Sequence, residues 1–144
     1  MKTGLGIFCL ILITTIGCRK QVEKDRPEFI GYWSGGSYME YGWTYIKIES
    51  SSRAEVYAYD HENEHEYYRH GKARADDEKL TIGGIKYFKI IEYPHPLDTT
   101  IVKHYVINHL DNSYKLATWI MVLEGMKGFI GLDLGTRTYY KADY

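Results

Sequence analysis

The chain has 144 residues and a formal net charge of −1, with 18 Lys and Arg against 19 Asp and Glu. A balance this even offers no basic patch for nucleic acid, so nucleic-acid binding is not expected. Two cysteines are too few for a disulfide framework, so a folded domain must depend on a hydrophobic core.

The N-terminus has the pattern of a secretory signal. Lys2 precedes an apolar run from Ile7 to Ile13, and Gly17 and Cys18 follow before charged residues begin. A basic region, an apolar region and a small residue before the cleavage point define such a signal. The apolar run is far shorter than the about 20 residues of a membrane-spanning helix. Residues 1–17 are therefore predicted to be a cleaved signal peptide.

A cysteine directly after the small residue is typical of bacterial lipoproteins. Ile16, Gly17 and Cys18 resemble their lipobox, with Thr15 where leucine is usual. The resemblance implies that Cys18 is acylated, which would hold the protein in the bacterial cell envelope, at the outer membrane. The alternative is a plain signal peptide with an incidental cysteine. Cys9 would leave with the signal, so no free thiol would remain in the mature protein.

Residues 19–28 carry charges of both signs and a single apolar side chain, Val22. We interpret residues 18–28 as the lipidated cysteine followed by a solvated tether, because a charge run of this kind is normally hydrated. A sorting role for Arg19 and Lys20 is the alternative. The remainder, residues 29–144, has the length of one domain.

From Phe29 onward, the chain is rich in Tyr, Ile, Val, Thr and Trp, and apolar residues tend to alternate with polar ones. This pattern favours strands. Short polar turns separate the candidates, which cover residues 29–33, 43–49, 53–60, 64–74, 79–82, 85–93, 100–110, 114–123 and 136–141. The sequence therefore predicts an all-β fold, a single antiparallel meander of about eight to nine strands that forms a barrel or a sandwich.

Two stretches leave questions about packing. Residues 117–128 contain an unbroken apolar run whose β-branched content predicts a strand buried on both faces. In residues 53–60, one face carries the small residues Ala54, Val56 and Ala58, and the other carries Glu55 and two tyrosines. Such a wall of small residues either packs closely against another element or leaves room for a cargo.

Gly31-Tyr32-Trp33 on the first predicted strand resembles the Gly-x-Trp start of the lipocalin and wider calycin barrels. Arg137, on the last strand, lies where those barrels place a basic side chain over that tryptophan. The resemblance implies a small lipocalin-like β-barrel domain of the kind found in bacterial lipoproteins. It also implies that Trp33 and Arg137 close the barrel through a cation–π contact. The alternative is an ordinary β-sandwich with Trp33 in its core.

His61-Glu62-Asn63-Glu64-His65 satisfies the His-Glu-x-x-His pattern of zinc metalloproteases. That motif requires a helix, which places both histidines on one face. Here the flanking residues are strand-like, so we interpret the five residues as the tip of a hairpin and predict no metal site. Adventitious metal binding by His61, His65 and His70 is the nearest alternative.

Other enzyme motifs are missing: there is no Gly-x-Ser-x-Gly elbow and no phosphate-binding Gly-x-x-x-x-Gly-Lys loop. The prediction is a protein without catalytic residues or cofactors. A metal-dependent hydrolase stays the remote alternative, which would require His61, His65 or His70 to converge with carboxylates in a cleft.

The tyrosines and tryptophans carry the more plausible function, because their rings suit both small amphipathic ligands and protein interfaces. A surface-anchored module that binds a small apolar or amphipathic ligand inside the barrel is the first hypothesis. The second is an interaction protein that docks a protein or glycan partner through exposed aromatics. The residues predicted to line a pocket lie mid-strand: Tyr57, Tyr59, Tyr68, Tyr105 and Trp119.

Overall fold

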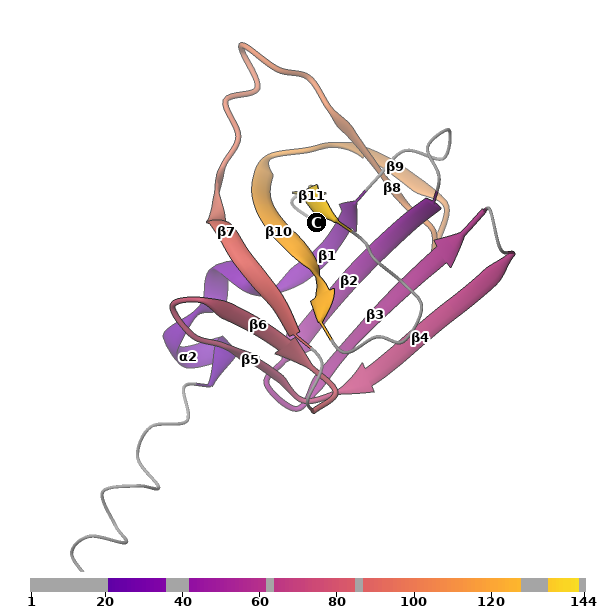
Figure 1. Cartoon of the computed structure of the whole chain (residues 1–144). Helices are drawn as coiled ribbons and strands as arrows, with labels where there is room; N and C mark the ends of the chain where they lie inside the picture. The colour runs from indigo at the N-terminus through magenta and orange to yellow at the C-terminus, as the bar shows by residue number, and fades with distance from the viewer. Residues whose placement is uncertain (1–20, 36–41, 62–63, 85–86, 128–134, 143–144) are drawn as a thin grey trace, which may run out of the picture.

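Strands account for most of the chain that the computed structural model describes, which is residues 21–35, 42–61, 64–84, 87–127 and 135–142 (Figure 1). A one-turn helix α2 (Val22–Asp25) and a 3-10 helix η1 (Pro27–Phe29) come first. The strands are β1 (Gly31–Gly35), β2 (Gly42–Ser50), β3 (Arg53–Asp60), β4 (His65–Gly71), β5 (Ala73–Ala75), β6 (Lys79–Ile82), β7 (Tyr87–Pro96), β8 (Tyr105–Asn108), β9 (Ser113–Leu116), β10 (Trp119–Lys127) and β11 (Thr136–Lys141). The all-β prediction is confirmed, whereas the signal peptide and Cys18 lie outside the described residues.

Nine of these strands form one antiparallel sheet in the order β4-β3-β2-β1-β11-β10-β7-β6-β5. The order is largely that of a meander, in which sequential strands are neighbours. The exceptions are β4 and β5, which lie at opposite ends of the order, the pairing of β11 with β1, and the β8–β9 hairpin, which is inserted between β7 and β10. Because the first strand pairs with the last, the sheet curls into a nearly closed barrel, as Figure 1 shows. The β8–β9 hairpin forms a separate two-stranded sheet outside it.

The seam of the barrel lies between β4 and β5, the two ends of the sheet order. Gly71 has a φ of 148° and Gly83 a φ of 68°, conformations that favour glycine. A Cβ on Gly71 would lie 3.0 Å from the Cα of Gly83. The Gly83 N–H also donates to the Lys72 carbonyl at 3.0 Å. Two glycines thus let the end of β4 and the turn after β6 approach closely.

The strand predicted over residues 64–74 is wrong as a single strand. β4 ends at Gly71, and Ala73 pairs with Ile82 of β6 instead of continuing along β3. The positive φ of Gly71 turns the chain at this point. Both halves alternate with the same period, so the sequence pattern could not reveal the change of partner.

The strands predicted over residues 100–110 and 114–123 also need correction. β8 covers only Tyr105–Asn108, since Thr100 lies in a turn where the Asp98 carboxylate accepts bonds from its N–H and hydroxyl. The second region divides into β9 and β10. Between them the chain returns from the hairpin to the barrel, and Thr118 N–H donates to the Lys141 carbonyl at 2.9 Å.

Strand β10 is buried on one face, not on both as predicted. Met121 and Leu123 are fully buried, whereas Ile120 and Val122 on the opposite face are partly exposed. An unbroken apolar run can therefore be an amphipathic strand whose outer side is only half covered.

At the other end of the domain, Phe29 belongs to η1 and β1 begins at Gly31, slightly later than predicted.

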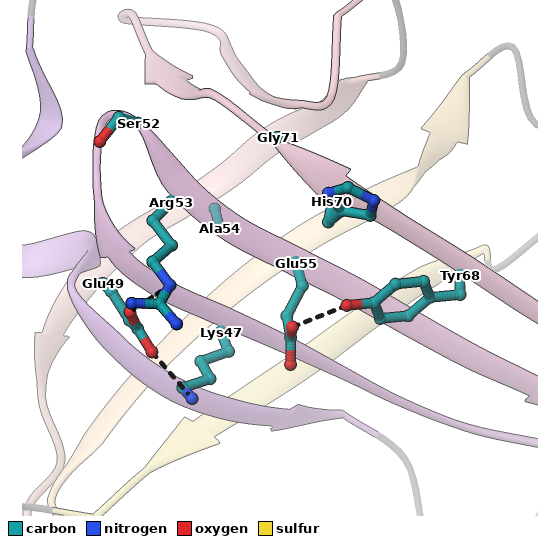
Figure 2. Close-up of a pocket in the computed structure, with 9 residues that line it drawn as sticks. All are labelled: Lys47, Glu49, Ser52, Arg53, Ala54, Glu55, Tyr68, His70 and Gly71. Carbon is teal, nitrogen blue, oxygen red and sulfur yellow. Dashed lines mark hydrogen bonds and ion pairs between the residues drawn. The ribbon is translucent and has the colours of Figure 1, made fainter.

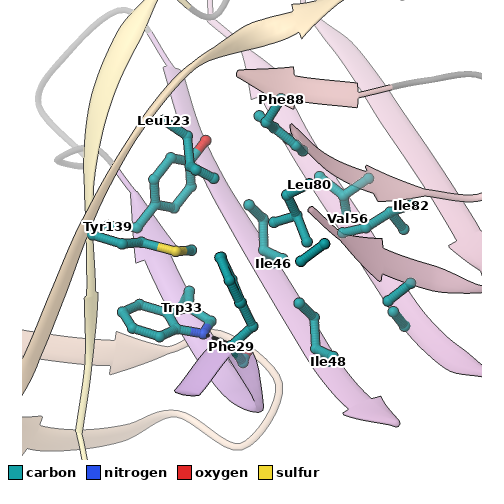
Figure 3. Packing of buried hydrophobic residues seen from close by; sticks show 14 of the residues in the cluster. Phe29, Trp33, Ile46, Ile48, Val56, Leu80, Ile82, Phe88, Leu123 and Tyr139 are labelled. Carbon is teal, nitrogen blue, oxygen red and sulfur yellow. Dashed lines mark hydrogen bonds between the residues drawn. The ribbon is translucent and has the colours of Figure 1, made fainter. Parts of the chain in front are cut away.

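The inward face of the barrel packs as one apolar cluster (Figure 3). Its largest fully buried side chains are Trp33, Tyr139, Phe29, Phe88, Ile46, Ile48, Leu80, Ile82, Met121 and Leu123. Ala54, Val56 and Ala58 of β3 belong to this cluster. Their membership favours close packing over room for a cargo as the role of the small residues.

Lys141 fastens the N-terminal segment to the end of the barrel. Its Nζ donates to the carbonyls of Glu28 at 3.2 Å and Ile30 at 2.9 Å. The same ammonium lies 4.7 Å from the ring centroid of Trp33 and 4.8 Å from that of Trp119. One cation therefore joins η1, β1, β10 and β11 through charge-assisted hydrogen bonds and cation–π contacts.

Trp33 is fully buried at this end, but the cation over it is Lys141 and not Arg137. Strand pairing explains this correction. Ser34 pairs with Tyr140, which brings Lys141 beside Trp33, whereas Arg137 pairs with Leu123 near the start of β11. Gly31 makes room for the lysine, because a Cβ there would lie 2.5 Å from Lys141 Cδ.

The solvated tether predicted over residues 18–28 is folded from Val22 onward. Val22 is fully buried in the main cluster, and its apolar side chain explains why the segment docks. Glu23 accepts hydrogen bonds from the Ser51 N–H at 2.6 Å and from the Ser51 hydroxyl at 2.8 Å, and the Arg26 guanidinium lies 5.2 Å from the Tyr93 ring centroid.

Within the described ranges, no helix has the length and hydropathy to cross a membrane.

We predict that Lys141→Met lowers the free energy of unfolding by about 2 kcal/mol, because hydrogen bonds from a charged donor contribute roughly 1.5–3 kcal/mol. Urea unfolding of the full chain measures this. Lys103→Met is the control, since Lys103 is exposed and its change should stay within about 0.5 kcal/mol. Equal stability of the two variants would contradict the role of Lys141.

Candidate functional site

The outward face of β1–β4 carries a ladder of aromatic side chains. Strand pairing aligns Tyr45 of β2 with Tyr57 of β3, and Tyr57 with Tyr68 of β4. The rings of Tyr45 and Tyr57 stack at a centroid distance of 5.5 Å, and Tyr32 of β1 stacks on Tyr45 at 5.2 Å. Such cross-strand pairs contribute up to about 1 kcal/mol each, so this aromatic ladder stabilises the wall on which any outer site is built.

The β8–β9 hairpin packs on this wall. Val106 on its inner face belongs to a second apolar cluster with Tyr32 and Tyr45. His109, directly after β8, stacks on Trp43 at a centroid distance of 4.0 Å, and its backbone N–H donates to the Tyr32 hydroxyl at 3.2 Å. Aromatic contacts therefore fix the hairpin to the outside of the barrel.

A second histidine holds the other end of β8. His104 stacks on Tyr140 of β11 at a centroid distance of 3.7 Å. Burial lowers the pKa of both His104 and His109. Both rings are consequently neutral at pH 7 and pack as flat, largely apolar surfaces.

The outer side of the hairpin is unusually apolar. Of the eight large hydrophobic residues that are exposed in the described chain, six lie within residues 101–114. They are Ile101, Val102, Tyr105, Ile107, Leu110 and Tyr114, and we call them the hairpin patch. Tyr105 and Tyr114 stack in parallel at a centroid distance of 4.8 Å, and Ile107 pairs with Tyr114 across the hairpin. These contacts join Tyr105, Ile107 and Tyr114 into one apolar surface across both strands.

Next to the ladder, a shallow groove of about 300 Å³ opens over β2, β3 and β4 (Figure 2). Its lining residues are Lys47, Glu49, Ser52, Arg53, Ala54, Glu55, Tyr68, His70 and Gly71. Strand pairing aligns Lys47 with Glu55 and Glu55 with His70, so the polar groups form a row across three strands. The groove is polar, unlike the hairpin patch.

Glu55 lies between the charged end and the aromatic end of the groove, as Figure 2 shows. Its two carboxylate oxygens accept hydrogen bonds from the Tyr45 hydroxyl at 3.2 Å and the Tyr68 hydroxyl at 2.8 Å. The bond to Glu55 raises the pKa of Tyr68, and burial together with the Glu55 charge raises the pKa of Tyr45. Both hydroxyls therefore stay protonated and hold the Glu55 carboxylate in place.

At the charged end, Glu49 accepts from Lys47 at 2.9 Å and from Arg53 at 3.0 Å. The hydrogen bond from Lys47 lowers the pKa of Glu49. With Glu55, the groove contains two carboxylates and two cations, so its formal charges balance.

The structure does not bring the predicted pocket residues together. Tyr57 and Tyr68 adjoin on the outer wall, and Tyr59 faces outward further along β3. Tyr105 belongs to the hairpin patch, whereas Trp119 packs against the main cluster at the Lys141 end. Alternation on β3 showed that the tyrosines share a face, but not that the face is the outer one.

The hairpin interpretation of the His-Glu-x-x-His pattern is confirmed. Asp60 of β3 pairs with His65 of β4, so His61 and His65 flank the connection between two strands; Glu62 and Asn63 lie outside the described residues. His70 lies at the other end of β4, in the groove. Among the residues with described positions, no group of three His, Cys, Asp or Glu side chains could hold a metal ion.

Sequence reasoning missed the hairpin patch apart from Tyr105. Its members Ile107 and Tyr114 lay in segments predicted as barrel strands, where apolar residues are expected to face a core. The available signal was the polar run Asp111-Asn112-Ser113, which marks a tight hairpin. Nothing in the sequence showed that this hairpin leaves the barrel.

Comparison with known proteins found no relative of this chain: no protein-family model, no curated protein and no solved structure matches it. The fold therefore defines a class, an antiparallel β-barrel-like domain with an external hairpin, and the residues alone carry any functional argument.

We predict that stability falls as the pH drops below about 6.5, in part because the folded state resists protonation of His109. Its pKa is lowered from 6.5 by burial, so the unfolded chain binds the proton first. Urea unfolding between pH 7 and pH 5 should show a smaller loss for His109→Asn than for the unmodified chain.

His95 acts in the opposite direction, because its hydrogen bond to Glu92 raises its pKa, so protonation favours the folded state. The comparison with His109→Asn cancels this effect, since both chains keep His95. An equal pH dependence in the two chains would refute the assignment to His109.

Proposed function

We propose that this protein is an envelope-anchored interaction module whose hairpin patch binds a protein partner. The single observation that carries the proposal is the concentration of exposed apolar side chains on residues 101–114. Monomeric proteins rarely expose large groups of neighbouring apolar side chains, and such groups mark interaction sites. Stacked tyrosines such as Tyr105 and Tyr114 are also enriched at protein interfaces.

The position of the patch favours a protein over the anchoring membrane. Figure 1 places α2, where the described chain begins, on one side of the barrel and the β8–β9 hairpin on the opposite side. If Cys18 carries the lipid, the patch faces away from the bilayer and toward the surrounding compartment.

The proposed anchor also sets how close the domain lies to the membrane. The fold begins at Val22, and an extended chain covers about 3.5 Å per residue. The barrel would therefore sit within roughly 15 Å of the acylated terminus. Placement at the outer membrane of a bacterial envelope is part of the same proposal and rests on the lipobox resemblance.

Binding of a small ligand inside the barrel has less support than docking of a protein partner at the hairpin patch. The inward side chains that the structure describes pack as one cluster, and Tyr57, Tyr59 and Tyr68 face outward. The lipocalin-like assignment stays a proposal, supported by the antiparallel meander and by Trp33 at the Lys141 end.

We expect a photoreactive benzoylphenylalanine at position 114 to crosslink to a discrete protein in intact source cells. Ile107→Glu in the same chain should reduce the crosslink at least about tenfold, because a charge in the centre of an apolar interface removes a main binding contribution. Mass spectrometry of the adduct identifies the partner.

Ile91→Glu is the matched control, since Ile91 is 50% exposed on β7 and Ile107 is 43% exposed on β8. The control should keep the crosslink. A crosslink that survives Ile107→Glu, or one that forms only with lipid, would rule out the proposed docking.

We predict that Cys18→Ser abolishes acylation and releases the protein from the membrane fraction. Intact-mass measurement of the purified chain should show a diacylglycerol and a further acyl chain on residue 18, and no acyl mass in the variant. Cys9→Ser, within the predicted signal peptide, should leave the mature mass unchanged. A mature protein with an unmodified Cys18 would overturn the anchor.

A further inference from the structure

We infer that the groove over β2, β3 and β4 is a binding site for a neutral carbohydrate. The site is separate from the hairpin patch and does not depend on its role. Its volume of about 300 Å³ lies at the lower end of the roughly 300–1,000 Å³ range of small-molecule sites, which suits one or two sugar rings.

Tyr68 supplies a stacking surface. Its side chain is 52% exposed, and the bond from its hydroxyl to Glu55 fixes the ring in one orientation. The electron-rich face of a tyrosine ring attracts the positively polarised C–H groups on one face of a sugar. A ring that is both exposed and held still loses little entropy when a ligand stacks on it.

Glu55 supplies acceptors beside that surface. An ionised carboxylate has about four acceptor positions, and the tyrosines occupy one on each oxygen. The positions that remain can accept sugar hydroxyls. At the other end of the groove, Arg53 is 81% exposed and bonds Glu49 only through Nε, so its guanidinium can donate to a ligand.

The charge balance indicates a neutral ligand. Lys47 and Arg53 already pair with Glu49, and Glu55 is the remaining carboxylate of the groove. An anion would meet Glu49 and Glu55, and a cation would meet Lys47 and Arg53. A ligand with many hydroxyl groups can instead donate to the carboxylates and accept from the cations without separating either ion pair.

The test is saturation-transfer NMR on the full chain, kept in a detergent without a sugar headgroup. Maltose and N,N′-diacetylchitobiose are the neutral probes, and glucose 6-phosphate is the anionic comparator. We expect transfer to the ring methine protons of at least one neutral disaccharide. Tyr68→Ala should weaken that binding about fivefold to tenfold.

Tyr114→Ala is the matched control, because Tyr114 is 63% exposed but lies on the hairpin, and it should bind as the unmodified chain does. Arg53→Ala, at an exposed position, should weaken binding about twofold to threefold and serves if Tyr68→Ala fails to fold. The inference is overturned by no transfer to either disaccharide, by stronger binding of glucose 6-phosphate, or by equal losses in the two tyrosine variants.

Discussion

The alternation of side chains along β1, β2 and β3 is the constraint on which the rest of this structure depends. Trp33, Ile46 and Val56 point into the main cluster, while their chain neighbours Tyr32 and Tyr45 point outward. A shift of one residue in any pair of these strands would exchange core and surface. The same pairing that builds the core therefore also assembles the aromatic ladder outside.

The packed core and the proposed binding surfaces lie on opposite faces of this wall. Inside, packed side chains and the Lys141 contacts close one end of the barrel. Outside, the hairpin is held on the wall through His104 and His109, and the polar groove opens beside Tyr68. Because the outer groups lie outside the main cluster, rings and charges can be exposed there without disturbing the packing of the core.

The hairpin shows how an insertion creates a surface that the barrel does not need. The segment between β7 and β10 could be a short turn, since these strands pair directly. It instead forms β8 and β9, buries Val106 against the wall and leaves Ile107 and Tyr114 exposed. Apolar side chains on both sides of a two-stranded sheet are costly in water unless something covers the second side. This cost is the physical reason to expect a partner there.

The sequence by itself determined the β class, most strand positions and the two faces of β3, because these follow from local alternation and turn chemistry. The sequence also predicted Trp33 as a core residue and the hairpin at His61 to His65, since both depend on nearby residues. Tertiary structure alone decided that Lys141 rather than Arg137 covers Trp33, that Val22 docks and that Gly71 marks a seam. It also placed Tyr57 and Tyr68 on the outer face of the barrel, and it packed the β8–β9 hairpin against the outside of the barrel instead of within the main sheet. These outcomes depend on which distant strands pair and in what register, and the free energy of those contacts is not encoded in any local pattern.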